Sequence, residues 1–205
     1  MPDAKPMSGT DPAVRAIVGL GNPGARYERT RHNVGFLVLE NLRGSAAWRK
    51  RPQREEAEVS LGGRPIRLMR PLTYMNRSGE AIARMMDEME AAPPEVLVVT
   101  DDVYLPWGKI RIRRSGGAGG HRGLESIVEE LESSAFPRIR VGVDAPPEGV
   151  PLEEFVLAPL EENDWMELQA IAARAAEAAR LICGEGLAEA MNRFNASVRS
   201  ESAQG

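Results

Sequence analysis

Two histidines, His32 and His121, are the only imidazoles in this chain of 205 residues, and both stand among polar or glycine residues. An imidazole can take a proton from water near neutral pH, provided that a neighbouring carboxylate orients its ring. Asp101 is a candidate for that carboxylate because it ends an apolar run, and Asn22 and Asn76 also border such runs. Their amides could hold a substrate carbonyl or stabilise an oxyanion. These residue types predict hydrolysis by an activated water molecule.

Other kinds of chemistry lack their residues in this sequence. No H-E-x-x-H or C-x-x-C spacing is present to bind a metal ion, and no G-x-S-x-G motif offers a serine nucleophile. Cys183, the one cysteine, lies in an apolar helical run, where we expect a buried thiol without a disulfide partner. We therefore predict a reaction without a metal ion, a cofactor or a covalent intermediate.

Each of these polar residues also has a purely structural explanation. Asn22 precedes Pro-Gly and could form an Asx turn, Asn76 could cap the following helix, and Asp101 could close the end of a strand. The glycine-rich loop 115–120 has basic neighbours and could bind any anion at the N-terminus of the next helix. The residues by themselves support a hydrolase of a phosphate-bearing substrate and leave these alternatives open.

A second function class is indicated by Gly19, Gly21 and Gly24, which follow an apolar strand with the G-x-G-x-x-G spacing of dinucleotide-binding proteins. In that motif the helix begins at the glycines, so that its N-terminus faces the pyrophosphate. Here Pro23 interrupts the motif, and the apolar periodicity of a helix begins only near Asn33. This mismatch argues against a nucleotide-dependent oxidoreductase.

The composition is that of an ordinary globular protein, with 42% hydrophobic and 27% charged residues. No apolar stretch approaches the roughly 20 residues that cross a bilayer, and the first dozen residues lack the apolar core of a signal peptide. We therefore expect a cytoplasmic protein without membrane contact. The net charge is −4, yet basic residues cluster locally. The cluster contains Lys109, Arg111, Arg113 and Arg114, and Arg138 and Arg140 lie on a later strand. It predicts one phosphate-binding surface on an acidic protein.

Alternating strand and helix patterns predict one α/β domain with helices on both faces of its sheet. We expect flexible tails over residues 1–13 and 199–205 and a single domain over 14–198. The predicted strands are 14–20, 58–61, 65–69, 95–100, 108–114 and 138–143, with an extended piece at 151–157. The predicted helices carry their apolar stripes over 34–42, 82–89, 124–131, 165–182 and 187–198.

Four motifs, at residues 19–24, 30–35, 74–79 and 119–124, closely resemble those of bacterial peptidyl-tRNA hydrolases, in the same order and with the same spacing. The resemblance extends from residue 14 to about 198. It implies a single α/β domain with a twisted mixed sheet, a monomer that works without metal. The family cleaves the ester between a peptide and the terminal ribose of tRNA, and so recycles tRNA from stalled translation.

The same resemblance implies roles for individual residues. His32 matches the catalytic base and Asp101 the carboxylate that orients it, while Asn22 and Asn76 match the groups that hold the peptide carbonyl and the attacking water. Asn22 also matches the position that separates N-blocked peptidyl-tRNA from aminoacyl-tRNA. The implied substrate contacts are Tyr27, Tyr74, Met75, Asn76, His121 and Arg122, and the implied tRNA phosphate contacts are Arg113 and Arg140.

One residue departs from the family pattern, because Arg122 stands where the family usually has asparagine. Asparagine can donate and accept hydrogen bonds, whereas a guanidinium only donates and carries a fixed charge. The main alternative to an enzyme is a non-catalytic RNA-binding relative with the same fold. Such a relative is expected to lack His32 or Asp101, and both are present.

Overall fold

The computed structural model describes residues 12–196. The predicted tails lie outside this range except for Pro12 and Ala13, and so does Val198, which was expected to continue the last helix. Within the described residues no helix is long and apolar enough to cross a membrane.

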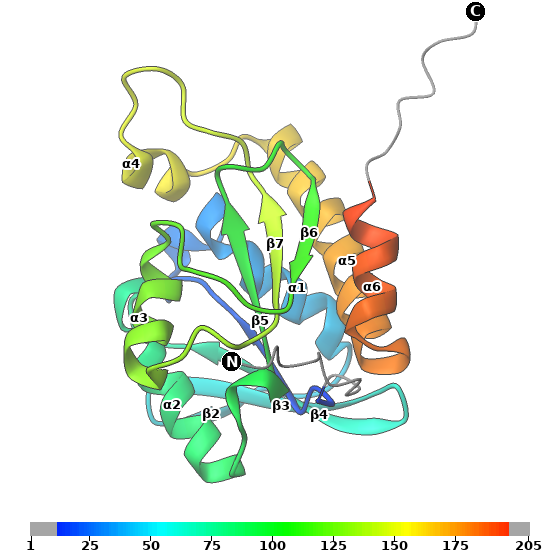
Figure 1. Ribbon diagram of the computed structural model, residues 1–205. Coiled ribbons are helices and arrows are strands. Elements are labelled where there is room, and N and C mark those ends of the chain that lie inside the picture. The colour runs from blue at the N-terminus through cyan, green and yellow to red at the C-terminus, as the bar shows by residue number, and fades with distance from the viewer. Residues whose placement is uncertain (1–11, 197–205) are drawn as a thin grey trace, which may run out of the picture.

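Seven strands form one mixed sheet in the order β2-β3-β4-β1-β5-β7-β6. The neighbours of β1 are both parallel to it, β5 and β7 are parallel, and the other pairs are antiparallel. Figure 1 shows a strong twist, because β5, β6 and β7 run almost upright while β2, β3 and β4 lie across the view. The strands are β1 (Ala16–Gly19), β2 (Arg49–Arg51), β3 (Arg54–Leu61), β4 (Arg64–Pro71), β5 (Val96–Asp102), β6 (Ile110–Arg113) and β7 (Arg138–Gly142).

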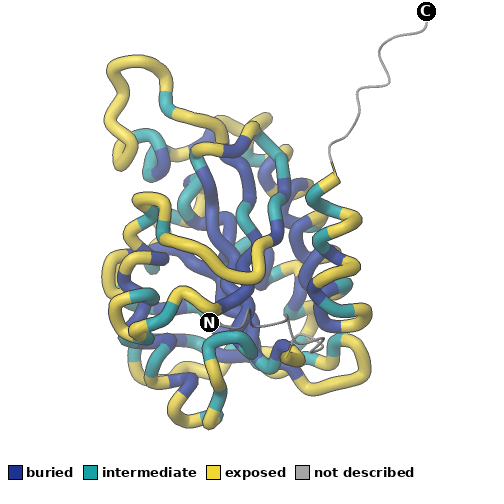
Figure 2. Tube along the Cα trace, in the orientation of Figure 1, coloured by how far each residue is buried: buried dark blue, intermediate teal, exposed yellow. Residues whose placement is uncertain are grey.

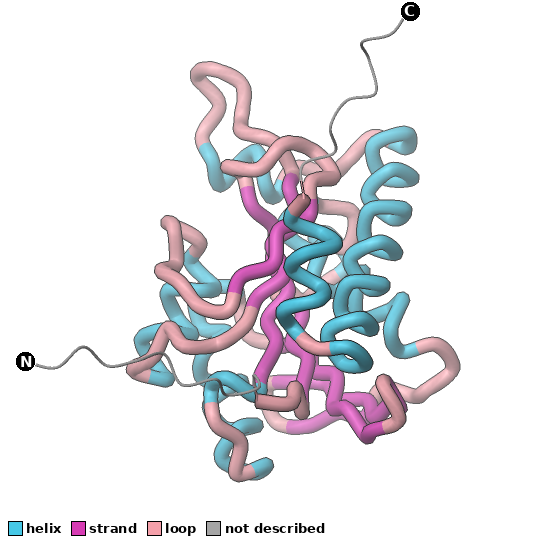
Figure 3. The backbone as a smooth tube through the Cα atoms, turned by 45° about the vertical axis from the view of Figure 1, so that its right-hand side comes forward, coloured by secondary structure: helices cyan, strands magenta, loops and turns pink. Residues whose placement is uncertain are grey.

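Helices cover both faces of this sheet, as the alternating pattern predicted (Figures 1 and 3). One apolar cluster joins one sheet face to α1, α5 and α6, and a second joins the other face to α2 and α3. The helices are α1 (Val34–Arg43), α2 (Ser78–Met89), α3 (Arg122–Leu131), α4 (Leu152–Leu157), α5 (Glu162–Glu185) and α6 (Leu187–Asn195).

The two central strands are the most deeply buried elements. Every residue of β1 and β5 is buried, so both strands are dark blue through the middle of Figure 2. Their continuous apolar, largely β-branched sequences suit strands that are covered on both faces. The polar residues at the end of β5, Asp101 and Asp102, are therefore held in a low-dielectric position by the rigid centre of the sheet.

The first glycine of the apparent dinucleotide motif, Gly19, has a packing role. A Cβ atom on Gly19 would lie 2.2 Å from the carbonyl oxygen of Gly35, and one on Gly35 would lie 2.4 Å from the backbone nitrogen of Leu20. Close approach of α1 to β1 therefore requires glycine at both positions. Two 3-10 turns, at Ala25–Tyr27 and Arg31–Asn33, precede α1. The helix begins ten residues after Gly24, at Val34, so it cannot present its N-terminus to a pyrophosphate at the glycines.

The hairpin predicted around Gly62-Gly63 is present and longer than expected, since it joins β3 to β4. Gly62 and Gly63 have φ angles of 58° and 73°. Two positive φ angles in a two-residue loop match the type I′ turn, whose twist follows that of the strands. β2 was not predicted, because its sequence Arg-Lys-Arg is exposed and has no apolar alternation.

One predicted element is wrong. Residues 151–157 were expected to be extended, but Leu152–Leu157 form the short helix α4. Pro151 precedes the helix, and Glu153 and Glu154 lie in its first turn, where acidic side chains favour helix formation. Only Val156 is buried, and six residues with one buried side chain leave no helical period to detect. The loop before α4 is mostly exposed (Figure 2).

Candidate active site

The predicted site residues converge where the carboxyl ends of β1 and β5 lie side by side. From β1 the chain continues toward β2, β3 and β4, and from β5 it continues toward β6 and β7 on the other side. Open α/β sheets form a crevice at such a point. A cavity of about 390 Å³ lies there. Of the predicted residues it is lined by Asn22, Tyr27, His32, Tyr74, Met75, Asn76, Asp101, His121, Arg122 and Arg140, while Arg113 is outside it.

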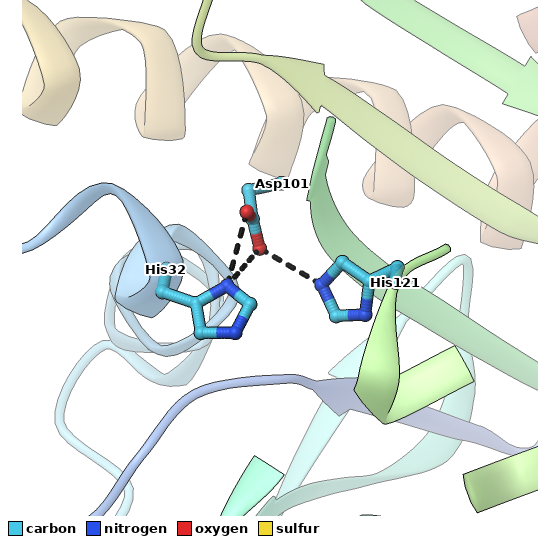
Figure 4. Close-up of side chains that lie close together, drawn as sticks. All are labelled: His32, Asp101 and His121. Carbon is cyan, nitrogen blue, oxygen red and sulfur yellow. Dashed lines mark hydrogen bonds and ion pairs between the residues drawn. The ribbon is translucent and has the colours of Figure 1, made fainter. Parts of the chain in front are cut away.

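His32 and Asp101 form a tight pair at the base of the cavity. His32 comes from the turn before α1, and its Nδ1 lies 3.0 Å from Oδ1 and 3.0 Å from Oδ2 of Asp101 (Figure 4). Because a carboxylate only accepts, Nδ1 carries the proton and Nε2 holds a lone pair. No described residue bonds to Nε2. This nitrogen can therefore accept a proton from a water molecule in the cavity.

The surroundings of this pair keep Asp101 ionised. Burial favours the neutral carboxyl, but His32 and His121 outweigh it and hold the pKa of Asp101 well below its usual range. For His32, burial acts to lower the pKa, but the charge and hydrogen bond of Asp101 raise it above the ordinary 6.5. Arg122 lowers and Glu153 raises the pKa of His32 as smaller influences. The imidazole of His32 therefore loses its second proton, and becomes a base, at a higher pH than a free histidine does.

His121 contacts the same carboxylate from the opposite side. Its Nε2 lies 3.0 Å from Oδ1 of Asp101 and 2.7 Å from Oγ1 of Thr100 (Figure 4). Its Nδ1 accepts hydrogen bonds from the backbone nitrogens of Gly123, at 3.1 Å, and Leu124, at 3.3 Å. His121 is therefore the N-cap of α3. The anion that the sequence allowed at this helix N-terminus would have to compete with the imidazole for these donors.

Asn22 is held by long-range contacts rather than by an Asx turn. Its Oδ1 accepts a hydrogen bond from the backbone nitrogen of Met75, at 2.8 Å. Its backbone nitrogen donates to Oδ1 of Asn33, at 2.8 Å, and its carbonyl oxygen accepts from Nδ2 of Asn33, at 3.0 Å. With its oxygen engaged, Asn22 has its NH₂ group left to donate to a ligand. Sequence reasoning missed Asn33 as the residue that fixes Asn22, although it lies beside His32.

Asn76 is exposed at the rim and caps no helix through its side chain. It belongs to the 3-10 turn Met75–Arg77, and neither this turn nor α2 has a side-chain cap. Its amide is therefore available at the cavity. Tyr74, which is 57% exposed, and the buried Met75 line the same wall. Tyr27 lies below the Arg26 guanidinium, whose central carbon is 4.5 Å from the ring centroid.

The arginines predicted to meet tRNA differ in their local partners. Arg140 forms an ion pair with the buried Asp102. In the register of β6 and β7 its direct neighbour is Arg111, whereas Arg113 lies opposite Arg138. Arg111 was noted as part of the basic cluster but not selected as a contact. The alternation of β6 was right, since Ile110 and Ile112 are buried while Arg111 is half-buried and Arg113 exposed.

Arg138 does not belong to the basic surface, contrary to the prediction. It is buried, it donates hydrogen bonds to the carbonyl oxygens of Gly117 and Ser134, and its guanidinium lies over the ring of Phe136. Burial, with a smaller effect of Arg140, lowers the pKa of Arg138 to about 10. Its role is to fix the glycine-rich loop to the sheet. Cys183 is buried and free, as predicted, and burial raises the pKa of its thiol to about 11.

Arg122 lies at the cavity rim and is already paired. Its Nη2 is 3.0 Å from Oε2 of Glu153, so the pair connects the first residue of α3 to α4. Both side chains are 62% exposed. An exposed pair of this kind has little intrinsic strength, so a substrate group can compete for Arg122.

His32, Asp101 and His121 together are residue types that bind zinc, and their ligand atoms lie within 4.8 Å of one another. A metal ion would need a lone pair on Nε2 of His121. The two backbone donors at Nδ1 require the lone pair there, which leaves the proton on Nε2. The geometry therefore fits a hydrogen-bonded triad better than a metal centre.

A buried carboxylate bonded to an imidazole, beside two asparagines at the crevice of an α/β sheet, is an arrangement typical of enzymes that activate water by general base catalysis. The family model described as peptidyl-tRNA hydrolase matches residues 16–203. The chain belongs to the peptidyl-tRNA hydrolase family.

Individual relatives resemble the chain over nearly all of its length. The peptidyl-tRNA hydrolase of Moorella thermoacetica is 44% identical over 186 residues, covering 89% of this chain and 98% of its own. That of Roseiflexus castenholzii is 45% identical, covering 88% and 86%. The crystal structure of peptidyl-tRNA hydrolase from Acinetobacter baumannii superposes with a TM-score of 0.84 at 32% identity, covering 92% of this chain and 97% of that one.

Proposed function

We propose that this chain hydrolyses the ester bond between the peptide and the tRNA of peptidyl-tRNA, and so recycles tRNA from stalled or aborted translation. The observation that carries this proposal is the free Nε2 of His32, held toward the cavity by the bond from Nδ1 to Asp101. The relatives named peptidyl-tRNA hydrolase, which match almost the whole chain, support the choice of substrate.

The reaction follows from the available donors and acceptors. Nε2 of His32 takes a proton from a water molecule as that water attacks the ester carbonyl carbon. Asp101 stabilises the imidazolium that forms. Asn22 and Asn76 donate hydrogen bonds to the carbonyl oxygen or hold the water. The C–O bond to the ribose then breaks, and His32 returns the proton to the departing 3′ oxygen, which gives a free peptide acid and a tRNA hydroxyl.

The cavity walls offer contacts for both ends of the substrate. Tyr27, Tyr74 and Met75 present apolar and aromatic surface for the peptide and the terminal adenosine. The NH₂ group of Asn22 can donate to the carbonyl of the acyl group that blocks the amino nitrogen of the substrate. An aminoacyl-tRNA has a free amino group and lacks this carbonyl, so the contact supports discrimination between peptidyl-tRNA and aminoacyl-tRNA. Arg113 and Arg140 are proposed to bind the 5′ phosphate of the tRNA, and Arg122 a polar group near its 3′ end.

We further propose a single domain over residues 14–198 that acts as a monomer in the cytoplasm, where translation produces the substrate, without a metal ion or membrane contact. A non-catalytic RNA-binding relative is the less favoured candidate, because both members of the His32–Asp101 pair are present and in contact.

The direct test is release of free tRNA from N-acetyl-aminoacyl-tRNA by the purified, chelator-treated protein. We expect release with the N-blocked substrate, little with the unblocked aminoacyl-tRNA, and a large loss in His32→Ala. Tight tRNA binding without release, in a folded protein, would contradict hydrolysis and favour the RNA-binding candidate. A spectral titration with NADH tests the oxidoreductase class, for which we expect no binding.

A further inference from the structure

The hydrogen bonds around His121 determine where its proton lies. The lone-pair side of Nδ1 faces two backbone N–H groups, those of Gly123 and Leu124. Because these groups can only donate, Nδ1 must accept. A neutral imidazole with an accepting Nδ1 carries its single proton on Nε2.

The groups around Nε2 agree with this assignment. The carboxylate of Asp101, 3.0 Å away, can only accept. The Thr100 hydroxyl, 2.7 Å away, donates its own proton to the carbonyl oxygen of Asp101, at 3.2 Å, so its lone pairs also face Nε2. The opposite tautomer would place a lone pair against the carboxylate and a proton against two N–H groups. Every described contact therefore selects the Nε2–H form.

His32 has the opposite tautomer beside the same carboxylate. Its Nδ1–H donates to Asp101, while its Nε2 is left for water. The two rings, with centroids 5.0 Å apart, hold Asp101 between them (Figure 4). Without a second donor, the buried carboxylate would have only His32 to fix its rotation among the described side chains.

We infer that His121 is a positioning residue for the reaction: the cap of α3 locks its proton on Nε2, and this proton holds Asp101 in the orientation that aligns His32. This role rests on the proposed function and differs from the substrate contact that the family resemblance implies for His121. It makes the first turn of α3 part of the catalytic support, because the backbone amides of that turn decide which nitrogen of His121 donates.

Two conservative substitutions separate the two functions of His121, which are to cap α3 through Nδ1 and to donate to Asp101 through Nε2–H. In His121→Asn the side-chain oxygen can replace Nδ1 as the cap of α3, but no group reaches Asp101 as Nε2–H does. In His121→Gln the longer amide can place an N–H group near the position of Nε2, but the residue is a poor N-cap. If His121 positions Asp101, the Asn variant keeps more of the thermal stability and loses more of the activity, whereas the Gln variant keeps more activity and loses more stability.

We expect kcat of His121→Asn to fall about ten-fold, which converts to about 1.4 kcal/mol of transition-state stabilisation, and that of His121→Gln to fall less. The acidic limb of the rate profile should move to higher pH in the Asn variant only, because an Asp101 with one donor fewer attracts the His32 imidazolium more strongly. The other charged groups that act on His32, Arg122 and Glu153, are unchanged in both variants. Activity that simply follows stability, with no movement of the limb, would overturn the inference.

The tautomers can be measured without any activity assay. The untagged chain contains two histidines, so ¹⁵N-histidine labelling gives the signals of two rings. We expect one ring protonated on Nε2, which is lost in the His121 variants, and one protonated on Nδ1, which is lost in His32→Ala. A His121 protonated on Nδ1 would refute the lock even if the enzyme is active. If the expected tautomers are found but no tRNA is released, the proposed function fails while the lock stands.

Discussion

His32 and His121 contact one carboxylate, but they use their rings differently. Nδ1 of His32 bonds to Asp101 and its Nε2 is available to the cavity, while both ring nitrogens of His121 bond to protein groups. By residue type alone, His32 and His121 are equally good candidates for the catalytic base. The difference teaches which ring can act as a base: only His32 has a ring nitrogen that no described residue occupies, whereas both nitrogens of His121 bond to the protein.

The largest expected effect is that of His32→Ala. We predict that kcat falls by at least ~100-fold, the usual contribution of a general base, with the fold retained. His121→Ala should cost much less, because the base itself remains. Steady-state kinetics on N-acetyl-aminoacyl-tRNA, with circular dichroism as the folding control, measure both. Near-normal turnover in His32→Ala would break the comparison and the mechanism with it.

Asp101→Asn is the next test, because it changes the partner that both rings share. The carboxylate raises the pKa of His32 above 6.5, so its removal should lower that pKa and move the acidic limb of the rate profile to lower pH. The loss of kcat should be smaller than in His32→Ala, since the imidazole remains. A pH series of kcat in wild type and variant measures the shift. An acidic limb that stays at the same pH or moves to higher pH would show that Asp101 does not raise the pKa of His32.

Arg113 and Arg140 differ in the same way as the two histidines, because one is free to bind a ligand and the other is bonded to the protein. Arg113 has no ion-pair partner among the described residues, whereas Arg140 is paired with Asp102. Arg113→Ala should raise KM for peptidyl-tRNA and reduce the salt slope by about one unit, since one phosphate contact is lost. Arg140→Ala should raise KM with a smaller change of slope, because Asp102 already acts as an internal counterion.

The same pair predicts a difference in stability. Removing Arg140 leaves the buried carboxylate of Asp102 without its partner, so thermal unfolding should occur at a lower temperature than in Arg113→Ala. Neither variant should change kcat much, and a minimal substrate without the 5′ phosphate should be indifferent to both. Equal losses on the minimal substrate would show that these arginines support the fold instead of tRNA.

The smallest expected effect belongs to Arg122, whose pair with Glu153 is exposed. Arg122→Ala should raise KM several-fold at constant kcat, Arg122→Asn should restore much of the affinity, and Glu153→Gln should lower KM by releasing the guanidinium. Kinetics of the three variants on one peptidyl-tRNA check this. Unchanged constants in all three would leave Arg122 as a surface residue, and a loss of kcat at constant KM would place it in the transition state.

The sequence was sufficient for features that rest on local patterns. The apolar runs of β1 and β5 predicted two buried strands, and the position of Asp101 at the end of the second made it a candidate partner of His32, a pairing that the family resemblance also implied. Contacts between distant segments were not accessible. Nothing in the sequence around Asn33 or Thr100 indicates a partner elsewhere in the chain. Arg138 and Arg140 occupy similar sequence positions, and only the hydrogen bond from Arg138 to the distant Gly117 separates their roles. Charged β2 and the short α4 lack the period that reveals an element.

The triad also has a consequence for the order in which the chain is made. Asp101 follows His32 by 69 residues, and His121 follows Asp101 by 20. The two histidines approach from opposite helical layers of the sheet, so the carboxylate is fixed only after both layers have docked. A chain still being synthesised, with β5 outside the ribosome and α3 inside, carries its base without its full support. Such an enzyme becomes competent late in its own translation, only after α3 and the C-terminal helices α5 and α6, which pack in the same layer as α1, have emerged and docked.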